Sequence, residues 1–260
     1  EEFCKLYKAE IKIPFSVGGV IPNYVREDKI ALLVDAGMNR VRMGIQSGSD
    51  NILQFYKRPT KLHRIKEATE ILNKFDKYMI PPSYDIILEN PVEKIEDTRA
   101  TVDMIYEMPR PFTLNVYALR VIPNTMMAKD IEDRGLKVPP IDKSYYIDYH
   151  RTIGNILIFA LTFWKLPKWL YKILLAKVYP VREKQTTYPI LFWITRMTYL
   201  VKRAFSHLRF MDFSLLPGRV GHVLWKLGII GFWQRFMLAH YDLSKNTKKN
   251  ESKYIQDTSD

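Results

Sequence analysis

Short apolar runs alternate with helical patterns along the first 136 residues. The apolar runs are bounded by Gly, Pro or Asn, which is typical of strands. The four predicted strands are residues 12–17, 40–45, 84–88 and 114–121. The predicted helices are residues 26–36, a short helix from residue 50, and residues 61–75, 97–106 and 126–134. Strands that alternate with helices predict a parallel sheet or barrel built from right-handed βα units.

Glycine and proline refine the borders of these elements. Pro14 would remove a hydrogen bond from a central strand, so the first strand is expected to be short or at an edge. Gly18 and Gly19 predict a turn at the end of that strand. Gly37 is a good stop for the helix over residues 26–36. Asp50 is the predicted N-cap of the short helix.

Two polar residues, Gln46 and Ser47, follow the second strand directly. In parallel α/β folds, ligands bind at the C-terminal ends of the strands. The polar loop is therefore a candidate binding site. The alternative is an ordinary strand–loop–helix connection whose glycines serve close packing, because a Gly-rich loop alone is a weak signal.

The C-terminal part has a different pattern. Residues 153–164 are apolar on all sides, residues 165–172 mix Lys with aromatic residues, and similar stretches cover 188–205 and 223–236. None of these runs reaches the length of about 20 apolar residues that a bilayer-spanning helix needs. The sequence predicts helices, and two placements remain open: packing over the mouth of the barrel, favoured for 145–180, or lying on a membrane surface, favoured for 188–236.

Charge divides the chain at the same place. Residues 1–150 carry 22 Lys and Arg and 22 Asp and Glu, whereas residues 151–260 carry 18 and 6. The basic excess suits an anionic membrane surface as a partner. Nucleic acid is not expected, since no motif supports it. The predicted divisions are 1–144, a basic and aromatic helical region at 145–243, and a polar, disordered tail at 244–260.

The single cysteine, Cys4, excludes an internal disulfide framework and indicates a reducing compartment. The first fifteen residues are rich in Glu and Lys, which excludes a signal peptide there. We expect a cytoplasmic protein, peripheral at the inner face of the membrane where it meets one. The five histidines show no metal-binding spacing and are interpreted as structural or surface residues.

The string Gly44-Ile-Gln-Ser-Gly48, with Arg58 twelve residues after Gln46, resembles the fourth strand and helix of radical S-adenosylmethionine (SAM) enzymes. It is most similar to the branch that carries a cobalamin-binding domain upstream. The resemblance is strong over residues 8–136. It implies an α/β fold: a partial (β/α) barrel comprising the third to sixth βα units, followed by an α-helical region.

The resemblance also implies site residues. Gln46, with Ser47 beside it, would contact the ribose or methionine part of SAM, and Arg58 would pair with the SAM carboxylate. Asp85 resembles a ribose-contacting carboxylate, with a structural role in the loop as the alternative. Residues 119–125 resemble the edge that holds adenine through backbone groups, which adds Arg120, Pro123 and Asn124. For Arg120 a salt bridge is the equal alternative. The role of Glu89 is left open, with a surface charge favoured over a ligand.

The family binds a [4Fe–4S] cluster through three cysteines spaced CxxxCxxC, and this sequence has no such motif. We expect the motif, and any cobalamin domain, to lie upstream in a longer protein. The resemblance implies that this chain is the C-terminal half of a radical SAM enzyme. The whole enzyme would generate a 5′-deoxyadenosyl radical or transfer methyl groups, and this chain alone would be inactive. Its substrate would be a small or lipid-like molecule. The alternative is a non-catalytic barrel remnant that binds SAM or a partner at a membrane.

Overall fold

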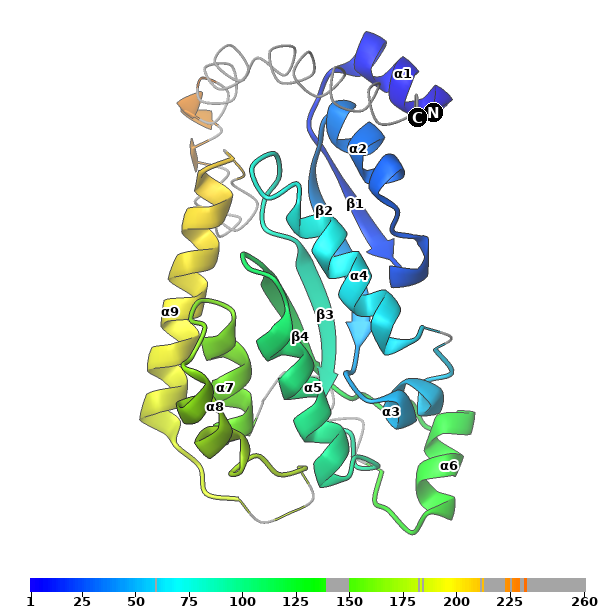
Figure 1. The fold of residues 1–260 in the computed structure, drawn as a ribbon, viewed down its shortest axis with the longest axis vertical. Coiled ribbons are helices and arrows are strands. Elements are labelled where there is room, and N and C mark those ends of the chain that lie inside the picture. The colour runs from blue at the N-terminus through cyan, green and yellow to red at the C-terminus, as the bar shows by residue number, and fades with distance from the viewer. Residues whose placement is uncertain are drawn as a thin grey trace.

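The computed structural model describes residues 1–58, 60–138, 150–181, 183, 185–210, 212, 223–224, 226–229 and 232. Its centre is one sheet of four parallel strands in the order β1-β2-β3-β4 (Figure 1). The strands are β1 (Phe15–Val20), β2 (Met38–Gln46), β3 (Ser83–Leu88) and β4 (Thr113–Ala118). The predicted parallel α/β architecture is confirmed, with strand order equal to chain order.

The helices lie between and after the strands. The N-terminal half contains α1 (Glu2–Leu6), a π-helical turn (Tyr7–Ile11), a 3-10 turn (Pro22–Tyr24), α2 (Glu27–Asp35), α3 (Asp50–Phe55), α4 (Leu62–Asn73), α5 (Ile95–Glu107) and α6 (Met126–Asp133). The C-terminal region contains α7 (Ile153–Leu161), α8 (Lys168–Leu175) and α9 (Pro189–Leu208). Each helix predicted up to residue 134 is present within a few residues of its expected borders.

The first strand differs most from its prediction. It begins at Phe15, directly after Pro14, and residues 12–14 stay outside it because proline cannot donate to the ladder. The strand is at the edge of the sheet, as Pro14 predicts. Gly18 and Gly19 lie inside the strand and not in a turn. The register shifts between Val17 and Val20, and Gly19 has a φ of 72°, so the pair forms a bulge.

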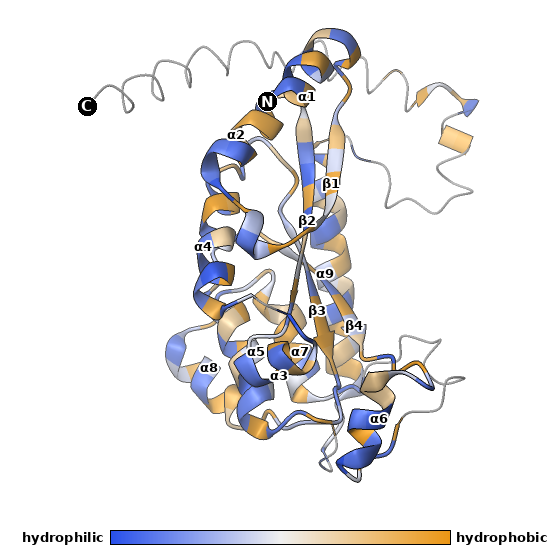
Figure 2. Ribbon diagram, turned by 90° about the vertical axis from the view of Figure 1, so that its right-hand side faces the viewer, coloured by the Kyte–Doolittle hydropathy of each residue, from blue (hydrophilic) through white to orange (hydrophobic). Residues whose placement is uncertain are grey.

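The two faces of the sheet differ in chemistry. Val41, Met43 and Ile45 of β2 are buried and belong to the main hydrophobic core. Helices α2, α4 and α5 cover that face (Figures 1 and 2). On the alternate positions β2 carries Arg42 and Gly44, which point to the opposite, polar face. The polar groups that could contact a ligand therefore lie on this second face of the sheet.

The C-terminal helices share the main core with the sheet. Helix α7 is buried along nearly its whole length and packs against α5 and α9. The rings of Tyr106 on α5 and Tyr171 on α8 stack at 3.8 Å, and Arg99 on α5 donates to the carbonyl oxygens of Ala176 and Val178. Helices α7 and α8 therefore pack beside α5, with the start of α7 at the end of β3. The predicted stretch at 223–236 and the tail 244–260 lie largely or wholly outside the described residues.

No helix in the described part of the chain is both long and apolar enough to cross a membrane.

Candidate functional site

The C-terminal end of β2 is shaped by Gly44 and Gln46. Gln46 is the last residue of β2 and has a φ of 75°, a left-handed conformation that residues with a side chain rarely adopt. Its amide folds back over Gly44, where a Cβ would lie 2.7 Å from Gln46 Nε2. A larger residue at position 44 would displace this amide. The two residues together therefore set where the Gln46 side chain lies.

The loop after Gln46 is anchored on α5. Ser47 is completely buried, and its Oγ lies 3.1 Å from Thr101 Oγ1. The Gly48 N–H donates to the same oxygen at 3.0 Å. A Cβ on Gly48 would lie 2.6 Å from the carbonyl oxygen of Ala100, so only glycine permits this approach. The Ser47 hydroxyl is therefore hydrogen-bonded within the protein, and this contact holds the loop that carries Gln46 against α5.

Helix α3 begins at this loop and is capped by Ser49. The Ser49 hydroxyl accepts from the Ile52 N–H at 3.4 Å and donates to Asp97 Oδ1 at 2.5 Å. The prediction of Asp50 as the N-cap is wrong by one residue, because the buried Ser49 hydroxyl reaches both the helix terminus and α5.

Asp85 lies on the polar face, in register with Gly44 of β2 and Asn115 of β4. Arg42 Nε lies 2.8 and 2.9 Å from the two carboxylate oxygens, and Asn115 Nδ2 donates to Oδ1 at 2.9 Å. Arg42 also donates to the Tyr117 hydroxyl at 2.7 Å. The carboxylate is therefore oriented by charge-assisted hydrogen bonds. Its register places it opposite Gly44, two residues before Gln46 on the neighbouring strand, and in the middle part of β3.

Helix α9 extends this polar network. Arg203 donates from Nη2 to Asn115 Oδ1 and from Nη1 to the Tyr199 hydroxyl, both at 3.1 Å. The Tyr199 hydroxyl in turn donates to the carbonyl oxygen of Leu114 on β4. The sequence holds no signal for this contact, because Arg203 and Asn115 are 88 residues apart. A residue of the basic C-terminal region thus supports the candidate site.

The other predicted site residues lie in exposed loops. Arg58 follows α3, and its backbone N–H donates to the Leu53 carbonyl oxygen at 2.8 Å while its side chain is exposed. Arg120 is exposed just beyond β4. Pro123 and Asn124 are exposed before α6, and Asn124 has a φ of 63°. Of the seven predicted residues, Gln46, Ser47 and Asp85 lie on or directly after the adjacent strands β2 and β3, and the other four lie on loops after α3 and β4.

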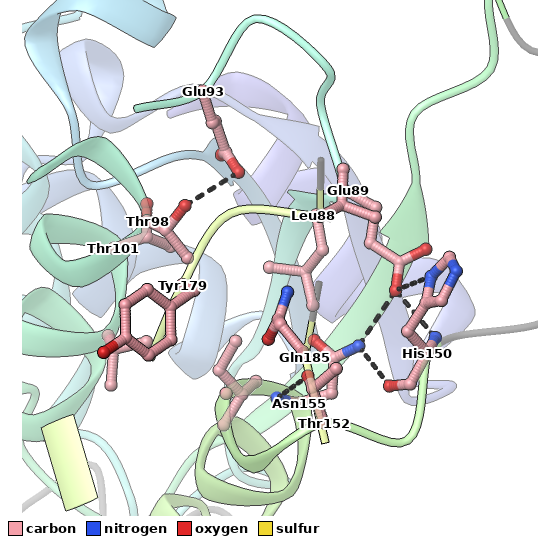
Figure 3. A pocket seen from close by; sticks show the side chains of 14 residues that line it. Leu88, Glu89, Glu93, Thr98, Thr101, His150, Thr152, Asn155, Tyr179 and Gln185 are labelled. Atoms are coloured by element: carbon pink, nitrogen blue, oxygen red, sulfur yellow. Dashed lines mark hydrogen bonds and ion pairs between the residues drawn. The ribbon is translucent and has the colours of Figure 1, made fainter. Parts of the chain in front are cut away.

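A small cavity of about 30 Å³ opens at the end of β3, between α5 and the start of α7 (Figure 3). Glu89 projects toward the N-terminal end of α7. Its Oε1 accepts from the His150 backbone N–H at 2.7 Å and from Asn155 Nδ2 at 2.9 Å, and it lies 3.1 Å from His150 Nδ1. The expectation that Glu89 is a surface charge is wrong: its side chain is 12% exposed and connects the sheet to α7.

Glu93 lines the opposite wall of this cavity and is 3% exposed. Thr98 Oγ1 donates to its carboxyl group at 3.2 Å. Burial raises the pKa of Glu93 to about 8, and Asp97 and Glu89 add to the increase. Glu93 is therefore mostly protonated at neutral pH. The cavity holds only one or two water molecules, so it is no site for a nucleoside. Sequence reasoning missed both this buried carboxyl group and the anchoring role of Glu89.

Residues 1–105 match the family model of the Radical SAM superfamily. The matched segment contains β1, β2, β3 and most of α5. It includes the Gly44–Gly48 turn and Asp85. This segment is therefore similar to the radical SAM superfamily, in agreement with the resemblance of the turn. No curated protein sequence matches the chain.

Several solved structures resemble the chain at low identity. The archaeal Elp3 of Methanocaldococcus infernus is 20% identical, with 77% of this chain and 45% of that chain covered and a TM-score of 0.41. The methyltransferase TsrM from Kitasatospora setae is 20% identical, with 54% and 28% covered and a TM-score of 0.42. The cobalamin-dependent enzyme OxsB is 14% identical, with 98% and 45% covered and a TM-score of 0.44. The chain spans less than half the length of each.

The two cofactors implied by the radical SAM superfamily fit this chain differently. A [4Fe–4S] cluster needs several thiolates, and the only cysteine, Cys4, is buried on α1. No metal-binding group of His, Cys, Asp or Glu exists within the described part of the chain. The chain's residues do not fit the cluster. Part of SAM is chemically compatible with the amide of Gln46 and the carboxylate of Asp85, which lie on adjacent strands.

Proposed function

We propose that this chain is the C-terminal half of a radical SAM catalytic domain and contributes the third to sixth βα units of its barrel. The observation that carries the proposal is the match of residues 1–105, on a sheet whose four parallel strands follow chain order. The polar residues at the end of β2 support it, because ligands of such folds bind at that end.

In this proposal the chain supplies the nucleoside and carboxylate contacts of SAM. Gln46 presents its amide to the ribose or methionine part, and Asp85 accepts hydrogen bonds from ribose. The loop that carries Arg58 brings a guanidinium group to the SAM carboxylate, which it suits through two parallel hydrogen bonds. Backbone groups near Pro123 and Asn124 hold adenine, and Arg120 lies beside them.

Positioning residues make these contacts specific. Ser47 does not touch the ligand in this account, since its hydroxyl bonds Thr101. It holds the Gln46 loop against α5. Arg42 and Asn115 orient the Asp85 carboxylate, and Arg203 holds Asn115. A preorganised polar face of this kind avoids the cost of reorienting dipoles when the ligand binds.

In this family SAM serves as the source of a carbon radical once it is reductively cleaved. The [4Fe–4S] ligands would come from outside this chain, so we expect the 260-residue chain alone to be inactive. The finer proposal is a cobalamin-dependent member that acts on a small or lipid-like substrate; the sequence of the Gly44–Gly48 turn motivates it.

The alternative function is a non-catalytic protein that keeps SAM binding without radical chemistry. The single cysteine favours this alternative for the chain taken alone. The two functions differ in one observable: the full-length protein forms 5′-deoxyadenosine from SAM under anaerobic reduction if it is an enzyme, and does not if it is a binding protein.

The residue-level test is calorimetric titration of the full-length protein with SAM. We expect Arg58→Ala to weaken SAM binding by about 2–5 kcal/mol if the bound ligand buries the ion pair, because the SAM carboxylate then loses its charged partner. Arg58→Lys should recover only part of this loss, since an ammonium group cannot form the two-pronged contact. Lys57→Ala, at the preceding exposed position, is the matched control and should bind SAM as the wild type does. Unchanged SAM binding in Arg58→Ala would remove Arg58 from the site.

A further inference from the structure

Helix α9 presents a continuous apolar stripe away from the core. Six of its large apolar residues, spaced so that they share one face of the 20-residue helix, are each between 51% and 78% exposed. These residues are Ile190, Trp193, Ile194, Met197, Val201 and Phe205. Exposed apolar residues are ordinary when scattered singly, but a stripe along one helix face indicates a binding surface.

The opposite face of α9 belongs to the core. Phe192 and Tyr199 are buried there. The basic residues of α9 also point inward: Arg196 lies over the Phe159 ring, Lys202 donates to the Thr162 carbonyl oxygen, and Arg203 donates to Asn115. The helix is therefore fixed by its inner face, and its outer stripe is left without polar side chains except Thr198.

Charge identifies the class of partner. Between residues 150 and 209 the sequence holds eleven Lys and Arg and a single acid, Glu183. Helix α9 contains no acidic residue. On α8, Trp169 and Ile173 are 66% and 52% exposed, and the neighbouring Lys168 and Lys172 are exposed as well. Tryptophan and lysine together on short helices suit the interface of an anionic lipid surface.

We propose that the outer stripe of α9, as defined above, lies in the interface of an anionic lipid bilayer, with α8 adding lysine contacts to lipid headgroups. Figure 1 places α9 at the outer flank of the molecule, beyond β4. From Ile190 to Leu208 a helix extends about 27 Å. Lying flat, it inserts its apolar face to the depth of the acyl boundary without spanning the bilayer.

This placement separates two contributions to membrane binding. Because the cations of α9 are bonded inside the protein, insertion of its stripe depends on apolar area and resists salt. The exposed lysines of α8 add an electrostatic contribution that salt screens. We therefore expect binding to anionic vesicles to weaken, and not vanish, between low and high salt.

The test is flotation of the whole 260-residue chain with vesicles of phosphatidylcholine alone or mixed with phosphatidylglycerol. Ile194→Glu should lower the partition coefficient at least about tenfold on both vesicles, because it places a charge in the stripe. Ile13→Glu is the matched control: Ile13 is 60% exposed and Ile194 59%, but Ile13 lies far from α9 in sequence, before β1. The double variant Lys168→Glu and Lys172→Glu should abolish the preference for anionic over neutral vesicles. Binding to neutral vesicles should remain unchanged.

Three results would overturn the proposal. The first is the absence of flotation on either vesicle. The second is equal loss of flotation in Ile13→Glu and Ile194→Glu while both remain folded by circular dichroism. The third is a self-associated wild-type chain that Ile194→Glu converts to a monomer in sedimentation without any vesicle binding, which would assign the stripe to a second copy of the chain.

Discussion

The sheet region, residues 1–138, and the helical region, residues 150–209, differ in where they place their apolar and polar side chains. The sheet region turns its apolar residues toward its own helices and leaves polar groups such as Arg42 and Asp85 on the open face. The helical region buries α7 and leaves apolar residues such as Trp193 outside. The family match ends within α5, inside the sheet region and before β4. The sheet region thus carries the polar groups of the proposed ligand site, whereas the helical region carries the exposed apolar side chains of the proposed lipid contact.

The two regions are nevertheless joined by specific contacts. Glu89 bonds to the start of α7, Arg99 holds the end of α8, and Arg203 reaches the polar face. Buried residues of both regions belong to the same hydrophobic cluster. A difference in composition is therefore no proof of independent folding. The predictions below test how far the two regions act as one.

The largest expected effect comes from Tyr106→Ala. Tyr106 is 7% exposed, stacks on Tyr171 and donates to the Leu166 carbonyl oxygen. Its removal should lower the free energy of unfolding by about 3–5 kcal/mol through the cavity left behind. Urea denaturation followed by both fluorescence and circular dichroism should show one transition at a lower midpoint. Two separate transitions, with the first confined to the tryptophans of the helical region, would show that the regions fold independently.

Glu93→Gln should change how stability depends on pH. The folded protein keeps a proton on Glu93 up to about pH 8, whereas the unfolded chain releases it near its ordinary pKa of 4.5. The free energy of unfolding of the wild type therefore falls as pH rises between these values. The variant should remove this decrease and be more stable at pH 8, by about 2–4 kcal/mol. Urea denaturation at pH 5 and pH 8 measures the difference; parallel pH profiles for the two proteins would contradict a raised pKa.

The smallest effect is expected from Arg99→Lys. The guanidinium donates to two carbonyl oxygens at the end of α8, and an ammonium group keeps the charge but not both bonds. We expect a loss of about 1 kcal/mol in unfolding free energy. Lys94→Arg, near the start of α5 and without a described contact to α8, serves as a control. A loss of unfolding free energy several times larger would mean that Arg99 stabilises the packing of α5 against α8 by more than its two hydrogen bonds account for.

How much the sequence revealed depended on the range of the interactions. The strand at 40–45 and the helix at 61–75 were predictable because their apolar periodicity reflects burial directly. Whether Ser49 or Asp50 caps α3 was not predictable, because the choice depends on a contact of Ser49 with Asp97, 48 residues away in the sequence. The roles of Glu89 and Arg203 depend on partners 66 and 88 residues away in the sequence, Asn155 on α7 and Asn115 on β4. For the candidate site, the end of β2 was predictable, whereas the network that orients Asp85 was not.

We propose that the chain forms the SAM-binding half of a radical SAM domain and lacks the ligands for its cluster. The most direct measurement is anaerobic reconstitution with iron and sulfide, followed by reduction with SAM and assay of 5′-deoxyadenosine, on the 260-residue chain and on the full-length protein. We predict no stoichiometric cluster and no product for the chain, and both for the full-length protein. A cluster with an EPR signal in the chain alone, or a full-length protein that forms no 5′-deoxyadenosine, would contradict the account.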